Sequence, residues 1–158
     1  MEHTQQVLSP TQLLEHWQGH RSLTRRVIEA FPEKEFFEFS IGGMRPFADI
    51  VKELLAIAAP GLQELVSGEK QEFDEERNYG DKKSDLLAHW DAATESINAL
   101  WEKLTIEKFD ETKVLFGQYE FPVRWHIFYF IDNEIHHRGQ GYVYLRGLGI
   151  EPPFFWER

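Results

Sequence analysis

The chain has 158 residues, of which 42% are hydrophobic and 15% aromatic, so it is too apolar for a disordered protein. Its formal net charge of −10 opposes binding to nucleic acid and anionic membranes, and the absence of cysteine excludes disulfides, thiolate nucleophiles and Cys-ligated zinc. The length fits one domain, residues 1–158. No signal peptide is visible and no apolar run reaches the roughly 18 residues that span a bilayer, so we predict a soluble cytoplasmic protein.

The first half of the chain predicts two helices with apolar residues every three to four positions. The first begins at Ser9 as the N-cap and Pro10 as the first helical residue, and it ends at Pro32. The second begins near Pro46, and we expect a kink or break where Pro60 occurs, with a weaker helical stretch beyond it.

The second half predicts two more helices and a short irregular segment. A polar loop over residues 67–83 precedes a third helix, for which Ser84 is the predicted cap. The segment KFDETKVLFGQYEFP has short apolar runs and a turn residue, Gly117, and predicts a small hairpin or a crossover. A fourth helix is expected over residues 122–147. The pattern indicates an all-α four-helix bundle with one or two long crossover connections.

The predicted fourth helix places Asn133 and His137 on one face, because residues four apart lie about one turn from each other. Three more polar side chains share this face: His126, Gln140 and Tyr144. The neighbouring His136 points about 100° away from His137, and His126 is too far along the helix to bind a common ion, at roughly 16 Å of rise. Spacing alone fits either a metal-ligand pair or a hydrogen-bonded polar pair.

The other faces of the fourth helix are apolar around most of the circumference, which predicts burial within the bundle or by a second subunit. Gly139 and Gly141 lie inside this helix, where each costs about 1 kcal/mol relative to alanine. Such glycines are usual where another backbone or a ligand approaches closely.

Two i, i+4 pairs on this helix read as ordinary surface ion pairs: Asp132 with His136, and Glu134 with Arg138. The chain has no HExxH motif, no Gly-rich phosphate loop and no G-x-S-x-G elbow. Residue spacing therefore leaves the chemistry of this helix open.

The run HHRGQ followed by YLRGLGIEPP resembles the signature of the DinB-like (DinB/YfiT) superfamily, and the similar helix layout extends over essentially the whole chain. The resemblance implies a four-helix bundle with an unusual connection order and a homodimer. It also implies a metal bound by three residues, commonly histidines: one from the second helix and two from an H-x-x-x-H pair that ends directly before Arg-Gly-Gln. Relatives of known activity include S-transferases and isomerases that use low-molecular-weight thiols.

Carried over to this chain, the resemblance assigns the metal ligands to His137, to Asn133 in place of the first histidine of the pair, and to Glu53 in the second helix. This set is harder than three imidazoles and shifts the preference toward Mn, Mg, Fe or Ni. The expected cofactor is a divalent ion, with Ni, Zn, Mn and Fe as candidates, or no ion at all. Further candidates for contact with the ligands or a substrate are His126, His136, Gln140 and Tyr144.

Two functions of different classes are compatible with the sequence. The first is a metal-dependent enzyme, a hydrolase or a thiol S-transferase, acting on a small molecule or a low-molecular-weight thiol. The alternative is a non-catalytic dimeric bundle with a stress-response or small-molecule-binding role, in which the metal site is lost or weakened. The two departures from histidine motivate this alternative. Neither nucleic acid nor a membrane is an expected partner, and no catalytic residue is assigned.

Overall fold

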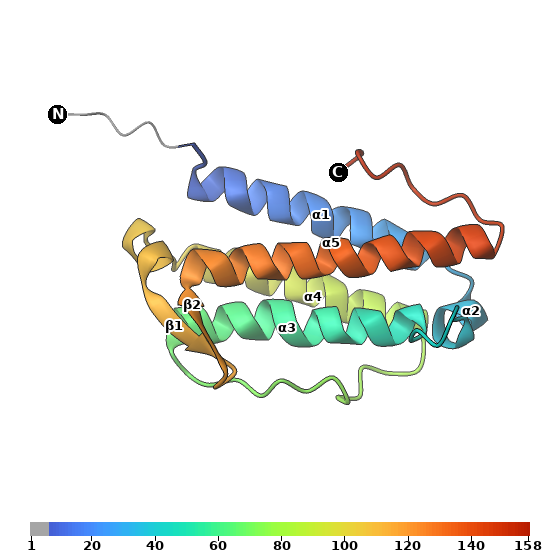
Figure 1. Cartoon of the computed structure of the whole chain (residues 1–158), viewed down its shortest axis with the longest axis horizontal. Coiled ribbons are helices and arrows are strands. Elements are labelled where there is room, and N and C mark those ends of the chain that lie inside the picture. Colours follow the sequence, from blue (N-terminus) through green and yellow to red (C-terminus); the bar gives the residue numbers. More distant parts are fainter. Residues whose placement is uncertain (1–6) are drawn as a thin grey trace.

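The computed structural model describes residues 7–158. Four long helices, α1 (Pro10–Ala30), α3 (Phe47–Ser67), α4 (Lys83–Trp101) and α5 (Val123–Gly147), form an all-α bundle. Helices α1 and α5 run in one direction, and α3 and α4 run in the other (Figure 1). Because α3 and α4 are parallel, residues 68–82 must cross the length of the bundle between them, which confirms the predicted long crossover.

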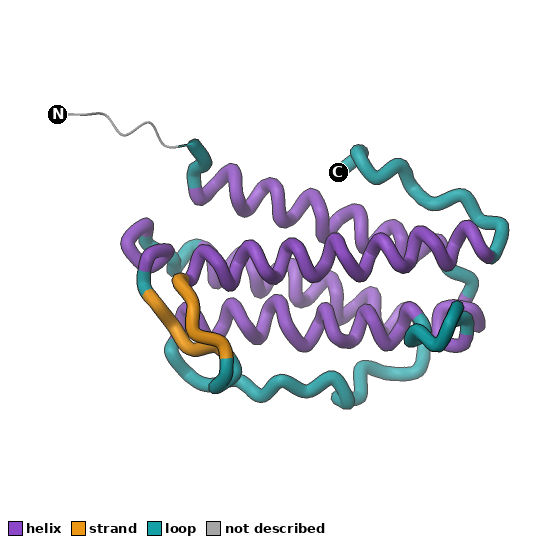
Figure 2. The backbone as a smooth tube through the Cα atoms, viewed as in Figure 1, coloured by secondary structure: helices purple, strands orange, loops and turns teal. Residues whose placement is uncertain are grey.

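Smaller elements close the two ends of the bundle. The short helix α2 (Glu33–Glu38) lies at one end (Figure 2). At the other end are the 3-10 helix η1 (Ile106–Asp110) and an antiparallel hairpin of β1 (Thr112–Leu115) and β2 (Tyr119–Pro122). The hairpin confirms one of the two structures predicted for this segment, and it turns at Gly117, whose φ of 70° suits glycine.

The predicted N-cap is confirmed for α1 but not for α4. In α1 the hydroxyl of Ser9 accepts from the Gln12 backbone N–H at 3.1 Å, and the Gln12 side chain accepts from the Ser9 N–H at 2.9 Å. In α4 the predicted cap, Ser84, is wrong. The helix begins at Lys83, so its N-cap is Lys82, two residues before the predicted cap, and the Asp85 carboxylate accepts from the backbone N–H of Lys82 at 3.1 Å.

Helix α3 continues through Pro60, so the predicted break does not occur. A proline inside a helix removes one backbone hydrogen bond and adds a steric clash, a penalty of about 3 kcal/mol. The helix packs against both α4 and α5, and most of its residues before and after Pro60 are buried. This tertiary packing outweighs the local penalty.

Within this single chain helix α5 is open to solvent along part of its surface, so the bundle alone does not bury it all round, and burial by a second subunit stays a prediction. The side chains of Trp125, Tyr129 and Val143 are 58%, 53% and 55% exposed. The glycines also differ: a Cβ on Gly141 would meet the buried Phe47 ring at 2.6 Å, whereas a Cβ on Gly139 would meet nothing within 4 Å. Close approach therefore explains only one of the two glycines. Within residues 7–158, no helix is long and apolar enough to cross a membrane.

Candidate functional site

Helices α3 and α5 bring together two of the three predicted ligands. Nε2 of His137 lies 3.0 Å from Oε1 of Glu53, although 84 residues separate them in the chain. Their side chains are 12% and 14% exposed, so the pair lies just below the surface. The helix packing alone places this histidine beside this carboxylate.

Arg45, which sequence reasoning missed, completes the pair. It lies just before α3 and donates to the second oxygen of Glu53, and it also contacts Glu75 on the crossover at 3.4 Å. Burial raises the pKa of the Glu53 carboxyl, but the hydrogen bond from Arg45 and the interactions with His137 outweigh it and hold the pKa below its usual range. Glu53 is therefore a carboxylate with both oxygens engaged. We call Arg45, Glu53 and His137 the pocket-side network.

Gln140 belongs to this network, as the shared helix face predicted. Its Oε1 lies 3.0 Å from Nδ1 of His137. With the carbonyl oxygen in this place, Nδ1–H donates to Gln140, and Nε2 faces the Glu53 oxygen. Turning the Gln140 amide would instead let Nε2–H donate to Glu53, so the 3.0 Å contact fits a hydrogen bond from the imidazole or an ion between the two atoms.

Asn133, the third predicted ligand, has no hydrogen bond from its buried Nδ2. It lies on α5 one turn before His137. A buried amide without a partner is unusual and marks a position where polar chemistry is incomplete. No hydrogen bond joins its side chain to Glu53 or His137 in the described part of the chain.

The remaining predicted residues have distinct places. The Tyr144 hydroxyl donates to the backbone carbonyl of Arg45 at 2.8 Å, so it holds the segment that carries the guanidinium. His126 is buried, and its Nε2 contacts the Lys113 carbonyl of β1 at 3.0 Å. His136 is exposed, with its ring edge-on to that of His137 at 5.1 Å between centroids.

The predicted surface pairing of Glu134 with Arg138 is wrong, because both side chains are buried between α5 and α1. Glu134 accepts from the Thr24 hydroxyl at 2.6 Å and lies 3.8 Å from Arg21, while Arg138 donates to the backbone carbonyl of His20 at 3.0 Å. Helical spacing could not reveal these partners, which come from another helix. We call these five residues the core-side network.

Asp132 and His136, the other predicted surface pair, are both exposed on α5. No ion pair joins them, although both belong to the described part of the chain. The spacing allowed the contact, but nothing holds the two exposed side chains together.

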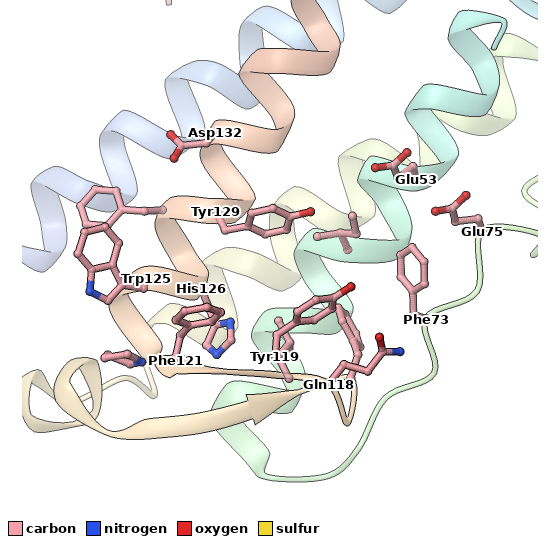
Figure 3. Close-up of a pocket in the computed structure, with 15 residues that line it drawn as sticks. Glu53, Phe73, Glu75, Gln118, Tyr119, Phe121, Trp125, His126, Tyr129 and Asp132 are labelled. Carbon is pink, nitrogen blue, oxygen red and sulfur yellow. The ribbon is translucent and has the colours of Figure 1, made fainter. Parts of the chain in front are cut away.

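A pocket of about 780 Å³ opens beside Glu53, among α3, α5, the hairpin and the crossover. Figure 3 shows Glu53 on α3 and Tyr129 on α5 at the same space, with Phe73 and Glu75 reaching it from the crossover. Most other lining residues are apolar or aromatic. Sequence patterns missed this pocket because its walls come from four segments that only the tertiary structure brings together.

A divalent ion between Glu53 and His137 can be tested against this geometry. Ligand atoms about 2.1 Å from an ion and at a right angle lie about 3 Å apart, so the observed 3.0 Å suits an ion and a hydrogen bond equally. The charges are less suitable, because Arg45 already balances Glu53. Within residues 7–158 no three His, Cys, Asp or Glu side chains are grouped to hold a metal. One imidazole, one paired carboxylate and one amide do not fit a tightly bound divalent ion.

Comparison with known proteins agrees with the geometry of the bundle. YjoA of Bacillus subtilis (strain 168), an uncharacterized protein, is 25% identical over 150 residues, which cover 93% of this chain and 96% of YjoA. Its crystal structure, that of a DinB-like protein, superposes with a TM-score of 0.74 and covers 93% of this chain and 99% of that one. A DinB-like protein from Bacillus cereus ATCC 10987 shares the fold, with a TM-score of 0.72 at 14% identity, over 91% of this chain and 95% of that one. The DinB family model matches residues 1–157, and the chain therefore belongs to the DinB family.

Proposed function

We propose that this protein binds a small molecule in the pocket beside Glu53 and that it does so without a metal ion. The observation that carries the proposal is the engagement of both Glu53 oxygens, one by His137 and one by Arg45. In this arrangement the guanidinium supplies the positive charge that an ion would otherwise bring to the carboxylate, and the imidazole occupies its other oxygen.

The charge balance supports a metal-free site. Arg45 contacts two carboxylates, those of Glu53 and Glu75, so these three groups carry a net charge of −1. A divalent ion would have to bind beside the guanidinium, and Glu53 would be its one negatively charged ligand. Repulsion from Arg45 and the weak, neutral amide of Asn133 both lower the affinity for such an ion.

The pocket itself supports small-molecule binding. Ligand sites are typically concave, mostly apolar and of roughly 300–1,000 Å³, with a few polar groups that orient the ligand. This pocket has a volume of about 780 Å³ and a mostly apolar wall. Glu53 lines the pocket, and its hydrogen-bond partner His137 does not. The pocket-side network thus fixes a charged group at the edge of an apolar space.

The proposal is tested with protein purified without an affinity tag or chelator. We expect elemental analysis to find substoichiometric metal, and we expect added Mn, Ni or Zn to leave the melting temperature unchanged. Binding of pocket-directed aromatic fragments, followed by NMR, should be the same with and without EDTA. Stoichiometric metal that is lost in His137→Ala but kept in the control His136→Ala would overturn the proposal.

A metal-dependent enzyme, a hydrolase or thiol S-transferase, is the second candidate, and the unpartnered Nδ2 of Asn133 favours it. Turning this amide exchanges its oxygen for its nitrogen, and Glu53, Asn133 and His137 would then be the ligands of Ni, Zn, Mn or Fe. A bound ion would make a coordinated water or thiol more acidic.

The variant Asn133→His separates the two candidates. If the wild-type site holds a metal weakly, a second imidazole should raise its affinity for Zn or Ni strongly, and Asn133→Ala should abolish binding. No metal binding by Asn133→His would exclude this candidate, because the variant has the stronger ligand set.

A homodimer is a further proposal, supported by the exposed face of α5. Trp125, Tyr129 and Val143 are more than half exposed on this helix, and Gly139 leaves room for close approach. Native mass spectrometry at micromolar concentration should show a dimer, and a monomer at all concentrations would contradict it.

A further inference from the structure

The pocket beside Glu53 has aromatic walls. Seven of its lining side chains are Phe, Tyr or Trp rings from the crossover, the hairpin and α5: Phe73, Phe116, Tyr119, Phe121, Trp125, Phe128 and Tyr129. Figure 3 shows the Tyr119 and Tyr129 rings and the Phe73 ring bordering the same space. The faces of aromatic rings carry negative potential and attract cations, most strongly when water is excluded. Such walls accept an apolar group and also favour a positive charge on it.

The charged groups that line the pocket are all acidic. Glu53, Glu75 and Asp132 line it, and none of the described lining residues is Lys or Arg. The one histidine in the lining, His126, uses its Nε2 for the Lys113 carbonyl. The pocket therefore offers three carboxylates and no fixed cation to a ligand.

Arg45 does not cancel this acidity. Its guanidinium binds Glu53 and Glu75 but is not part of the pocket lining, so two carboxylates face one cation there, and Asp132 has no such partner. The burial and the nearby carboxylate of Glu53 raise the pKa of Tyr129, which places the Tyr129 hydroxyl in the same negative field. The net charge of −10 extends this field beyond the pocket.

We propose that the ligand of this pocket is an organic cation with an apolar body, such as an aromatic or alkyl amine or a quaternary ammonium compound. The inference rests on the proposed metal-free binding function and names its ligand class. The aromatic rings surround the cationic head and the body of the ligand, and Glu53, Glu75 and Asp132 supply the opposite charge. An anionic ligand would meet three lining carboxylates that outnumber the one nearby guanidinium, Arg45, which lies outside the lining.

The test compares two probes of equal shape, benzyltrimethylammonium and its uncharged carbon isostere neopentylbenzene, in buffer with EDTA. Binding is followed by NMR and by the fluorescence of Trp125 and the other tryptophans. We expect the cation to bind at least about tenfold more tightly than the isostere, because only the cation gains the cation–π and carboxylate interactions. Its affinity should fall as salt is added.

Two variants and a matched control locate the effect. Tyr129→Leu keeps apolar volume but removes one ring, and Asp132→Asn removes one charge; each should weaken cation binding severalfold and by a larger factor than it changes isostere binding. Phe154→Leu, a change of an exposed aromatic residue outside the pocket lining, should alter neither.

The outcomes separate the two proposals. Equal affinities for both probes, or tighter binding of the isostere, would overturn the cationic ligand while metal-free pocket binding stands. Binding that requires an added divalent ion would overturn the proposed function itself. Failure of both probes to bind would overturn both.

Discussion

Two charged networks meet helix α5 on neighbouring faces, and their surroundings differ. In the core-side network, Glu134 and Arg21 have side chains only 2% and 1% exposed. In the pocket-side network the Glu53 and Arg45 side chains are 14% and 42% exposed. Similar residue types thus lie in two environments: one closed by α1, and one open at the edge of a pocket.

The carboxyl groups respond in opposite directions. Burial raises the pKa of Glu134 despite the opposing effects of Arg21 and Thr24, whereas the contacts of Glu53 with Arg45 and His137 leave its pKa lowered. Removing charges from water is expensive, and a buried pair mainly makes the loss of either partner destabilising. A partly exposed network contributes little stability and leaves its groups available to a ligand. The comparison predicts that the core-side network maintains the fold and the pocket-side network serves binding.

The largest expected effect comes from the core-side carboxylate. Glu134→Gln keeps the side-chain volume but leaves Arg21 and Arg138 buried without their counter-charge. We expect a loss of about 3–5 kcal/mol in the free energy of unfolding, measured by urea denaturation. The matched change Glu53→Gln should cost less than about 1 kcal/mol, since exposed ion pairs contribute little. Equal losses in the two variants would contradict the comparison.

Alanine substitutions at the two glycines of α5 compare its buried face, at Gly141, with its open face, at Gly139. Gly141→Ala pushes a Cβ into the Phe47 ring, which is packed against Phe31 and cannot move freely. Overpacking of this kind costs roughly 1–3 kcal/mol. Gly139→Ala has free space and should stabilise the helix by up to about 1 kcal/mol. Thermal unfolding measures both changes. If Gly139→Ala destabilises the protein in a concentration-dependent manner, a second copy packs at this face.

The smallest expected effect is the pH dependence of stability, which we assign to His20 of the core-side network. Burial, followed by the nearby Arg138, His16 and Arg158, lowers the pKa of His20 from its usual 6.5 to about 3. The unfolded chain therefore binds a proton at higher pH than the folded chain, so stability is full above pH 6.5 and falls as the pH drops toward 3.

Urea titrations between pH 7 and pH 5 measure this loss, in a range above the usual pKa values of exposed carboxyl groups. His20→Gln should flatten most of the decline. His16, whose pKa burial also lowers, contributes in the same direction. A decline that is as steep in His20→Gln as in the wild-type chain would show that His20 is not held neutral in the folded state.

Local sequence determined much of the framework. The Ser9 cap, Pro10 and the apolar spacing set the first helix, and α5 begins and ends where Pro122 and Gly147 indicated. Helical spacing and the family resemblance also singled out His137 and Glu53, which lie together in the structure. These features depend on hydrogen bonds and side-chain directions within a few residues, or on a motif that relatives share, so the sequence alone could show them.

Only the tertiary structure decided the surroundings of the site. Glu134 and Arg138 have surface-pair spacing, but their burial depends on α1. Arg45, which binds Glu53, and Glu75, which binds Arg45, come from segments without regular periodicity. The aromatic pocket is likewise assembled from the crossover, the hairpin and two helices. A residue's own helix sets the direction of its side chain, but burial and electrostatic environment depend on which other segments pack against it. Those contacts join residues far apart in the chain, and no local pattern encodes them.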